Sequence, residues 1–396
     1  MRTFLLALAA LLPAAAGAQR IIFDPHLDLP ASAASPDWNG RSDPASQFDL
    51  DRARAGGLTA IGLALFVPQG ERTLTSEAEA RWSLAARYAA LRRLVDSNHD
   101  QVTLALSPAE VRVAAASGRL AVVPTILNAW PIGDDPAGFD AWYACGVRIV
   151  GFVHAGHNQF ADSSRPSLPR GERADAQGGL TPLGLATVRH LNDLGVLIDV
   201  SQLSDRAFDQ VLAASRAPVV ATHSDVRARV DVPRNLSDAQ LDALAAKGSV
   251  VAINAFSAYL RPDAPATKAS ILALRREFGV SPAGSTALAP DRQAEYTRRY
   301  YALRTREPKA TLVDLVDAID HAVRRIGIDH VAISSDFNHG GGVVGWNDVG
   351  ETANVTAELQ RRGYAAADID KLCGGNLLRV WQAAIDARAQ GAGGGR

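Results

Sequence analysis

Short apolar runs recur along the chain, and most of them are rich in β-branched residues and nearly continuous. Strands of a parallel sheet have this pattern, because helices cover both faces of the sheet and leave few positions in water. Eight runs are therefore predicted to be strands: residues 21–28, 58–67, 120–127, 147–154, 196–202, 219–224, 250–256 and 331–337.

Amphipathic segments, in which apolar residues recur with the helical period, lie between these runs. The clearest predicted helices are residues 77–98, 180–194, 205–214, 238–247 and 311–326. An alternation of eight strands with helices predicts an α/β fold, a TIM-like (β/α)8 barrel. A further apolar run, residues 102–106, is another strand candidate: it is either an excursion from the barrel or a replacement for one of the eight.

One connection is much longer than the others. Residues 258–308 precede the last predicted strand and far exceed a usual loop between a strand and a helix. This insertion contains a predicted helix at 270–278 and a charged segment at 291–306, and we expect it to serve as a lid or a subunit contact. Because no repeat or composition shift divides the chain, residues 19–390 are predicted to form a single domain, followed by a flexible glycine-rich tail at 391–396.

The first 18 residues have the features of a cleavable signal peptide. Arg2 supplies a positive charge, an apolar stretch follows at residues 4–12, and Ala16-Gly17-Ala18 is a small-residue cleavage signal. The apolar stretch is too short to span a bilayer, and no cysteine follows the cut for attachment of a lipid. We therefore expect a secreted or periplasmic protein that begins at Gln19 and has no membrane anchor.

Charge and cysteine content narrow the expected partners. The formal net charge is −1 and no basic run is present, so neither nucleic acid nor an anionic membrane is an expected partner. Cys145 and Cys373 could form one disulfide in an oxidising compartment, but a chain of this size does not need it. Two buried free thiols are the preferred interpretation.

The predicted strand ends are unusually polar. His26 and Asp28 alternate along the first strand, so their side chains lie on one face and can bind one divalent ion. His154, His223 and Asp336 lie at or near the ends of three other strands. Burial of such groups without partners is costly, and barrel enzymes carry their chemistry at the carboxyl ends of the strands. The pattern predicts a metal or catalytic centre at one mouth of the barrel.

These residues resemble the renal (membrane) dipeptidase family of zinc dipeptidases, which have an amidohydrolase-like barrel. The similarity follows the mature chain in order. It is carried by Asp24-x-His26-x-Asp28-x-Pro30, Gly146-Val147-Arg148 leading to His154, Asp199-Val200-Ser201, His223-Ser224 with Arg234-Asn235, Ser335-Asp336-Phe337 and Gly374-Gly375-Asn376. The resemblance implies hydrolysis of dipeptides by a metal-activated water, tolerance of a D-configured C-terminal residue, and a homodimer.

The resemblance also implies how the metal is held. His26 and Asp28 match ligands of the first metal, with Asp336 beside them as a ligand or a proton shuttle. His223 matches a ligand of the second metal. Three or four such ligands with an open position for water are typical of a catalytic zinc site.

Two positions depart from the family pattern. The family has a glutamate that bridges both metals at the end of the third strand, where this chain has Leu127. The family has a histidine on the fifth strand, where this chain has Gln202. Leucine cannot bind a metal and glutamine is a weak neutral donor. We therefore expect about one Zn²⁺, or another divalent ion, per chain.

The substrate contacts follow from the same resemblance. His154 matches a histidine that faces the substrate and its developing oxyanion, and Arg234 matches the arginine that pairs with the substrate's C-terminal carboxylate. A guanidinium fork suits that role. Asn128 and Gln202 are expected either to bind water or a substrate amide where the second metal is missing, or to be satisfied polar residues at strand ends.

Three further polar features lie on loops near these strand ends. His157 and His339 are each close enough in sequence to join the site, although loop histidines of this kind usually take no part. The segment 162–166 after the fourth strand predicts a structured loop near the site, with Arg165 in solvent if the segment only forms a turn.

The sequence favours one function and leaves two alternatives. The favoured function is an exported metal-dependent dipeptidase, a metallopeptidase acting on small dipeptides. One alternative is a related amide or lactone hydrolase that uses one metal. The other is a non-catalytic exported peptide-binding protein that keeps the carboxylate clamp of Arg234, an alternative that the missing glutamate keeps open.

Overall fold

Eight parallel strands form the barrel that the apolar runs predict. The structure, a computed structural model, describes residues 20–281 and 287–392, so the predicted signal peptide and the last four residues of the predicted tail lie outside it. Neighbouring strands along the barrel are hydrogen-bonded in parallel pairs. They are β1 (Phe23–Asp28), β2 (Ala60–Phe66), β4 (Leu120–Leu127), β5 (Ile149–Gly151), β6 (Leu197–Asp199), β7 (Val220–Ala221), β8 (Val250–Asn254) and β9 (Val331–Ser334).

Most strands are shorter than the apolar runs that predict them. β4 matches its run, but β5 ends before His154, β7 ends before His223, and β9 ends before Asp336. The chain leaves the sheet where the run becomes polar. Several candidate site residues therefore lie on the segments directly after the strands, and not within them.

The barrel is closed between β1 and the segment that follows β9. The amide of Asp28 donates to the carbonyl of Phe337 at 3.0 Å, and the amide of Asp336 donates to the carbonyl of His26 at 3.2 Å. The buried Asp24 carboxylate accepts hydrogen bonds from the amide of Ser335, at 3.1 Å, and from its hydroxyl. This seam joins the first and last strands of the barrel and places the segment around Asp336 directly beside β1.

The additional apolar run forms a short strand outside the barrel. β3 (Val102–Leu104) pairs with the first residues of β4, and β5 pairs with the last residues of the same strand on that side. β3 is therefore an excursion and does not replace any of the eight barrel strands.

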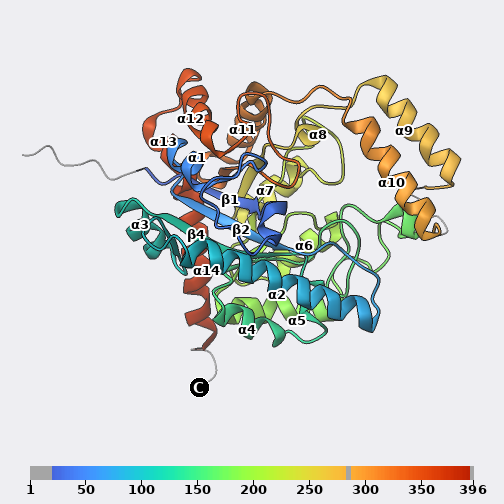
Figure 1. The fold of residues 1–396 in the computed structure, drawn as a ribbon, viewed down its shortest axis with the longest axis horizontal. Helices are drawn as coiled ribbons and strands as arrows, with labels where there is room; N and C mark the ends of the chain where they lie inside the picture. Colours follow the sequence, from blue (N-terminus) through green and yellow to red (C-terminus); the bar gives the residue numbers. More distant parts are fainter. Residues whose placement is uncertain (1–19, 282–286, 393–396) are drawn as a thin grey trace, which may run out of the picture.

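Helices surround the barrel as the amphipathic segments predict (Figure 1). The predicted segments are α2 (Leu74–Asp96), α5 (Pro182–Leu194), α6 (Asp205–Ala214), α7 (Asp238–Ala246) and α11 (Leu312–Ile326). Capping boxes start two of them: Ser237 and Gln240 at α7, Thr311 and Asp314 at α11. Further helices are α1 (Leu50–Ala55), α3 (Pro108–Ala116), α4 (Gly138–Ala144), α8 (Ser257–Leu260), α12 (Thr352–Arg361) and α13 (Ala366–Asp370).

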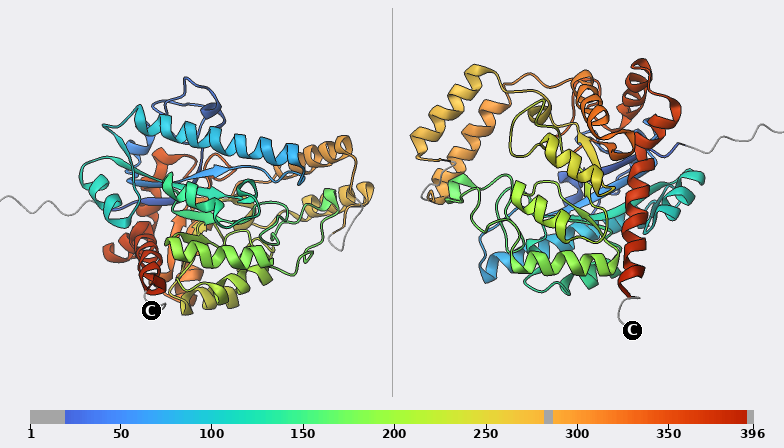
Figure 2. Two further views of the ribbon diagram at one scale, coloured as in Figure 1. Left: turned by 90° about the horizontal axis from the view of Figure 1, so that it is seen from below. Right: turned by 180° about the vertical axis from the view of Figure 1, so that it is seen from behind.

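The last helix, α14 (Asn376–Ala392), covers the amino ends of the strands. Its buried Trp381 belongs to a core cluster with the first residues of several strands, among them Phe23, Ala60, Ala121 and Val250. Figure 2, right, shows α14 along the back of the barrel. Because this apolar cluster fills one end of the barrel, the polar residues of the interior are gathered at the other.

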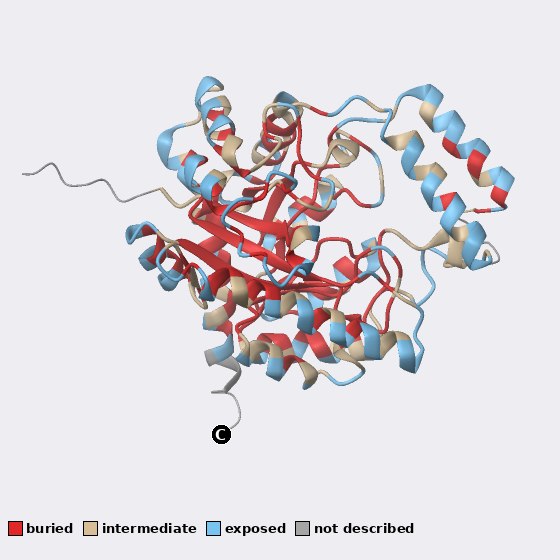
Figure 3. Ribbon diagram, viewed as in Figure 1, coloured by how far each residue is buried: buried red, intermediate tan, exposed pale blue. Residues whose placement is uncertain are grey.

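The long insertion forms a helical hairpin, α9 (Pro265–Phe278) and α10 (Pro290–Arg304), that projects from one side of the barrel (Figure 1). Its outer surface is largely exposed (Figure 3). α9 begins earlier than the predicted helix at 270–278. The hairpin rests on a short turn, Leu168–Arg170, in the loop between β5 and α5, where the amide of Leu288 donates to the carbonyl of Pro169 at 2.8 Å.

Both cysteines are free thiols, so no disulfide joins them. Cys373 is buried, as predicted, but Cys145 is half-buried. Among the helices of residues 20–281 and 287–392, none is long and apolar enough to cross a membrane.

Candidate active site

Strained backbone marks the carboxyl ends of three strands. Among the described residues, only four non-glycine residues have a positive φ: Asn128 at 67°, Gln202 at 71°, Asp336 at 56° and Asn338 at 64°. A side chain in this region costs about 1–3 kcal/mol, and such residues cluster at functional sites. The first three are candidate site residues from the sequence. The surrounding structure therefore holds these strand ends in conformations that they would not adopt alone.

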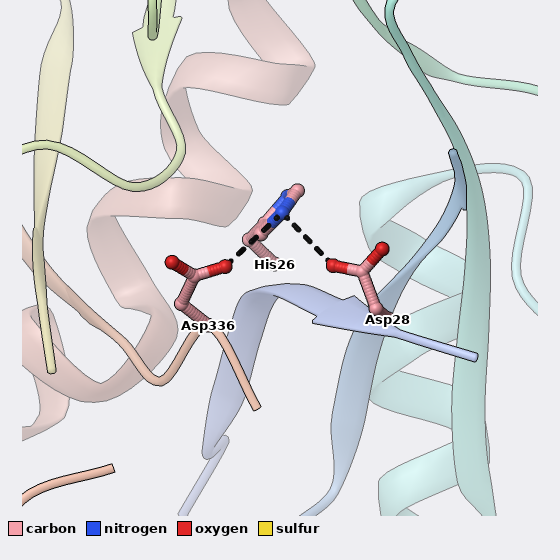
Figure 4. A group of neighbouring side chains, drawn as sticks. All are labelled: His26, Asp28 and Asp336. Atoms are coloured by element: carbon pink, nitrogen blue, oxygen red, sulfur yellow. Dashed lines mark ion pairs between the residues drawn. The ribbon is translucent and has the colours of Figure 1, made fainter. Parts of the chain in front are cut away.

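The centre of the site is a buried group of one imidazole and two carboxylates. The Nε2 atom of His26 lies 3.4 Å from an oxygen of Asp28 and 3.6 Å from an oxygen of Asp336 (Figure 4). One possible ligand atom from each residue lies within 4.8 Å of the others. Within the described residues, this is the one group of histidine, cysteine or carboxylate side chains close enough to hold a metal ion.

Two atoms of this group indicate what it is built to bind. His26 Nε2 and Asp28 Oδ2 are buried, face each other, and have no hydrogen-bond partner among the described residues. Buried polar atoms are nearly always paired or coordinated to a metal. An imidazole nitrogen with carboxylate oxygens is a suitable donor set for Zn²⁺ or a similar divalent ion. The residues present therefore fit the metal that the sequence predicts.

The two carboxyl groups differ in their electrostatics. Burial alone would raise the pKa of Asp28, but its interactions with His339 and His26 outweigh burial and hold that pKa below the usual range. Burial raises the pKa of Asp336, although the charges of His26 and His339 oppose the shift. Asp28 is therefore a firmly ionised ligand, whereas Asp336 is suited to accept and return a proton.

His339 contacts this group, although a loop histidine of this kind is not expected to take part. Its Nδ1 atom lies 3.2 Å from Asp28, and its ring packs against the rings of Phe66 and His154. The other loop histidine, His157, lies apart: it accepts a hydrogen bond from the Ser163 amide and bonds to a backbone carbonyl at Arg173. His339 joins the site because its loop folds back onto β1, which no local sequence pattern shows.

His223 lies directly beside the metal-binding group. Its ring stacks on His26 with centroids 3.7 Å apart, and its Nδ1 atom is 2.8 Å from the hydroxyl of Thr222. That hydroxyl donates to Asp199 at 2.6 Å. Burial, followed by the charges of His26 and Arg234, lowers the pKa of His223 well below its ordinary value. His223 is therefore neutral at neutral pH.

A chain of polar side chains continues from His223 to His154. The amide of Gln202 contacts His223 Nε2 at 3.0 Å, and the oxygen of Gln202 accepts from Arg165 at 2.7 Å. The same Arg165 nitrogen donates to His154 Nε2 at 2.9 Å. Arg165 therefore lies within the site and not in solvent. The sequence only indicated a structured loop here.

Apolar side chains surround the position at which the family resemblance implies a bridging glutamate. Leu127 packs with Ala64 and Phe66 in a small buried cluster at the carboxyl ends of β2 and β4. The strand register aligns Leu127 with Phe66 on one side and with Gly151 on the other. The Leu127 side chain therefore cannot act as a ligand for a second ion at this position.

The remaining candidates differ in their contacts. Arg234 is 4% exposed and donates to the Ser224 hydroxyl, at 2.9 Å, and to the carbonyl of His223. Asn128 donates to the carbonyl of Val67 and accepts from Asn158. Arg234 is thus anchored beside the His223 backbone. Asn128 is engaged with residues that follow the two neighbouring strands, β2 and β5, which favours the structural alternative for that residue.

Comparisons with known proteins agree with this geometry. The sequence profile of the membrane dipeptidase family, peptidase family M19, matches residues 15–392. The probable dipeptidase PvdM from Pseudomonas aeruginosa has a crystal structure that is 43% identical in sequence, with a TM-score of 0.88 over 93% of this chain and 96% of that chain. The dipeptidase verJ of Clonostachys rogersoniana is 28% identical over 346 residues, covering 84% of this chain and 74% of verJ.

A more distant solved structure shares the fold. A metallopeptidase from Rhodobacter sphaeroides, bound to a phosphinate mimic of the dipeptide L-Ala-D-Ala, is 24% identical with a TM-score of 0.72 over 92% of this chain and 99% of that chain. The family profile spans nearly the whole described barrel, and the site contains a metal-binding group at its carboxyl end. The chain belongs to the membrane dipeptidase family of metallopeptidases, peptidase family M19.

Proposed function

We propose that this protein is an exported dipeptidase that hydrolyses the peptide bond of free dipeptides with one divalent ion, Zn²⁺, in its site. The observation that carries the proposal is the buried group of His26, Asp28 and Asp336, in which two facing atoms have no hydrogen-bond partner in the part of the chain that the structure describes. Membership of a metallo-dipeptidase family gives the reaction class. The predicted signal peptide supports export.

His26, Asp28 and Asp336 divide the chemistry. His26 and Asp28 would hold the divalent ion, which would supply the nucleophile by lowering the pKa of a water molecule. Asp336 takes the proton of that water and returns it to the leaving amine. Its burial raises its pKa toward a value useful for this exchange, and Asn254 orients its carboxyl group through a 3.3 Å hydrogen bond to Oδ2.

Arg234 and His154 orient the substrate in this proposal. Arg234 offers its remaining N–H groups to the C-terminal carboxylate, and that contact limits the substrate to two residues. His154 lies between Phe66 and Arg165. Burial and the charge of Arg165 lower the pKa of His154 well below its ordinary value, so it acts as a neutral imidazole.

Dipeptides with a D-configured C-terminal residue are included in the proposed substrate class. The family resemblance supports this, as does the L-Ala-D-Ala mimic bound to the Rhodobacter sphaeroides metallopeptidase. The test is an assay of dialysed protein on paired L,L and L,D dipeptides. We expect hydrolysis that a chelator abolishes and added Zn²⁺ restores.

Two results would change the assignment. Dipeptides that bind without being cleaved, in a protein that takes up no metal, would support the peptide-binding alternative. Cleavage of amides or lactones but of no dipeptide would support the related hydrolase. Fractionation of the producing cells, with N-terminal sequencing of the mature protein, tests export separately and is expected to give Gln19 as the first residue.

A further inference from the structure

The donors and acceptors around Arg165 can be assigned without ambiguity, because a guanidinium can only donate. Gln202 must present its oxygen to Arg165, so its amide nitrogen faces His223 Nε2 and donates to it. His223 therefore carries its proton on Nδ1 and gives it to the oxygen of Thr222, whose own proton goes to Asp199. His154 Nε2 likewise accepts from Arg165.

This assignment leaves neither imidazole a free lone pair for a second ion. The Nε2 atoms of His223 and His154 both accept hydrogen bonds, and the oxygen of Gln202 accepts from Arg165. The adjoining wall is apolar at Leu127. A guanidinium already supplies positive charge here. The residues therefore do not fit a second metal, in contrast to the metal-binding group at His26.

The loop holds Arg165 in place from several directions. Its amide donates to the hydroxyl of Ser163 at 3.0 Å, and its carbonyl accepts from the amide of Gly156 at 2.8 Å. Ser164 donates from both its amide, at 2.8 Å, and its hydroxyl, at 3.0 Å, to the carbonyl of Gln202. The loop is therefore fastened to the same residue that the Arg165 side chain contacts, and the cation is preorganised.

Part of the guanidinium is still available to a ligand. Nη2 uses its two protons on His154 and Gln202, whereas Nη1 and Nε make no hydrogen bond to any residue that the structure describes. Each terminal nitrogen of Arg234 donates one hydrogen bond to a protein oxygen and keeps a second proton. Arg165 is half-buried, and Arg234 is buried.

We infer that Arg165 is a catalytic residue that binds the negatively charged oxygen formed on the scissile carbonyl, at the place where other members of the family hold a second metal. The inference rests on the proposed dipeptidase activity. His154 cannot donate from Nε2 to this oxygen while it accepts from Arg165, so the donor at this position is the guanidinium. Its charge is fixed before the reaction begins, as effective stabilisation of an oxyanion requires.

The role follows the electrons of the hydrolysis. When the oxygen of water bonds to the carbonyl carbon, the π-electron pair moves onto the carbonyl oxygen and a proton passes to Asp336. Arg165 Nη1 donates to that oxygen while it is negative. The pair then re-forms the carbonyl, the carbon–nitrogen bond breaks, and the amine leaves with the proton from Asp336. Arg165 neither gains nor loses a proton.

The test measures the binding of a phosphinate dipeptide mimic, whose tetrahedral anion resembles the reacting state, to wild type and to Arg165→Gln. We expect affinity for the mimic and kcat to fall about 100–1,000-fold, while KM changes only a few-fold and metal content is unchanged. Arg165→Lys keeps the charge but cannot contact His154 and Gln202 together, so it should recover only part of the loss. Arg173→Gln, on an exposed arginine of the same loop, is the matched control.

Several outcomes would overturn the inference. Unchanged mimic affinity in a folded Arg165→Gln variant would mean that Arg165 is structural, while wild-type hydrolysis would leave the proposed function intact. A rise in KM with unchanged kcat would assign Arg165 to the ground-state carboxylate. Failure of wild type both to bind the mimic and to cleave dipeptides would remove the proposed function and the role of Arg165 together. Thermal unfolding of each variant shows whether a loss reflects misfolding.

Discussion

On the β1–β9 side of the barrel mouth, His26 Nε2 and Asp28 Oδ2 are buried without a hydrogen-bond partner among the described residues. On the β5–β7 side, the acceptor atoms of His154, His223 and Gln202 all take part in a chain of hydrogen bonds that includes Arg165. The first side leaves two ligand atoms for a cation. The second carries its own cation. The comparison suggests a general point about this fold: the positive charge that a reacting peptide requires can come from a metal ion at the His26–Asp28 position and from an arginine at the Arg165 position.

The largest expected effect comes from removal of a ligand on the incomplete side. Asp28→Asn replaces an ionised carboxylate with a neutral amide, so the bound metal should fall from about one equivalent per chain toward zero. Because the metal is lost, kcat/KM should decrease by at least about a thousandfold. Metal analysis and a dipeptide assay measure this. Asp242→Asn, at a surface carboxylate paired with Arg325, is the control. Retention of the metal by Asp28→Asn would show that the ion lies elsewhere.

The next prediction concerns the carboxylate clamp. Arg234→Ala should weaken transition-state binding of free dipeptides by roughly 2–5 kcal/mol, because a desolvated charged pair is lost. Dipeptides with an amidated C-terminus lack that pair and should lose much less. The amidated substrate also corrects for disturbance of the Ser224 and His223 contacts that Arg234 makes. Equal losses on both substrates would show that Arg234 only supports the local structure.

The smallest effect is expected from a change at His339, which contacts Asp28 of the metal-binding group. His339→Ala removes the imidazole that lies 3.2 Å from Asp28, and metal affinity should fall about 10–100-fold. A titration against a competing chelator measures the change. His190→Ala, at a histidine that pairs with Asp140 on the outer helices, should have no effect. An unchanged affinity in His339→Ala would make this contact incidental.

The sequence predicts the barrel and the metal-binding group on the β1–β9 side. Eight apolar runs are enough for the strands, and the polar ends of those runs indicate His26, Asp28 and Asp336, because alternation in a strand is a local property. Leu127 and Gln202 are also visible as departures from a family pattern. What they contact is not visible, since their partners come from other strands and loops.

Arg165 shows why the contacts on the β5–β7 side could not be predicted from the sequence. It lies in an irregular loop, where no periodicity assigns a direction to a side chain, and a lone arginine before a proline is ordinary in a turn. Its place in the site depends on the hydrogen bonds of Ser163 and Ser164, which fasten the loop to Gln202. The position of His339 is hidden from the sequence for the same reason, because the fold brings its loop back to β1.

The number of metal ions in the purified protein tests the central claim most directly. Mass spectrometry of extensively dialysed wild type should give about one equivalent of divalent metal per chain, because within the described residues the metal-binding group lies on the β1–β9 side alone. The triple variant Leu127→Glu, Gln202→His, Arg165→Ala restores the missing donors and removes the competing charge, so it should gain a second equivalent. Two equivalents in the wild type would contradict the account, because a second ion would then share the barrel mouth with Arg165.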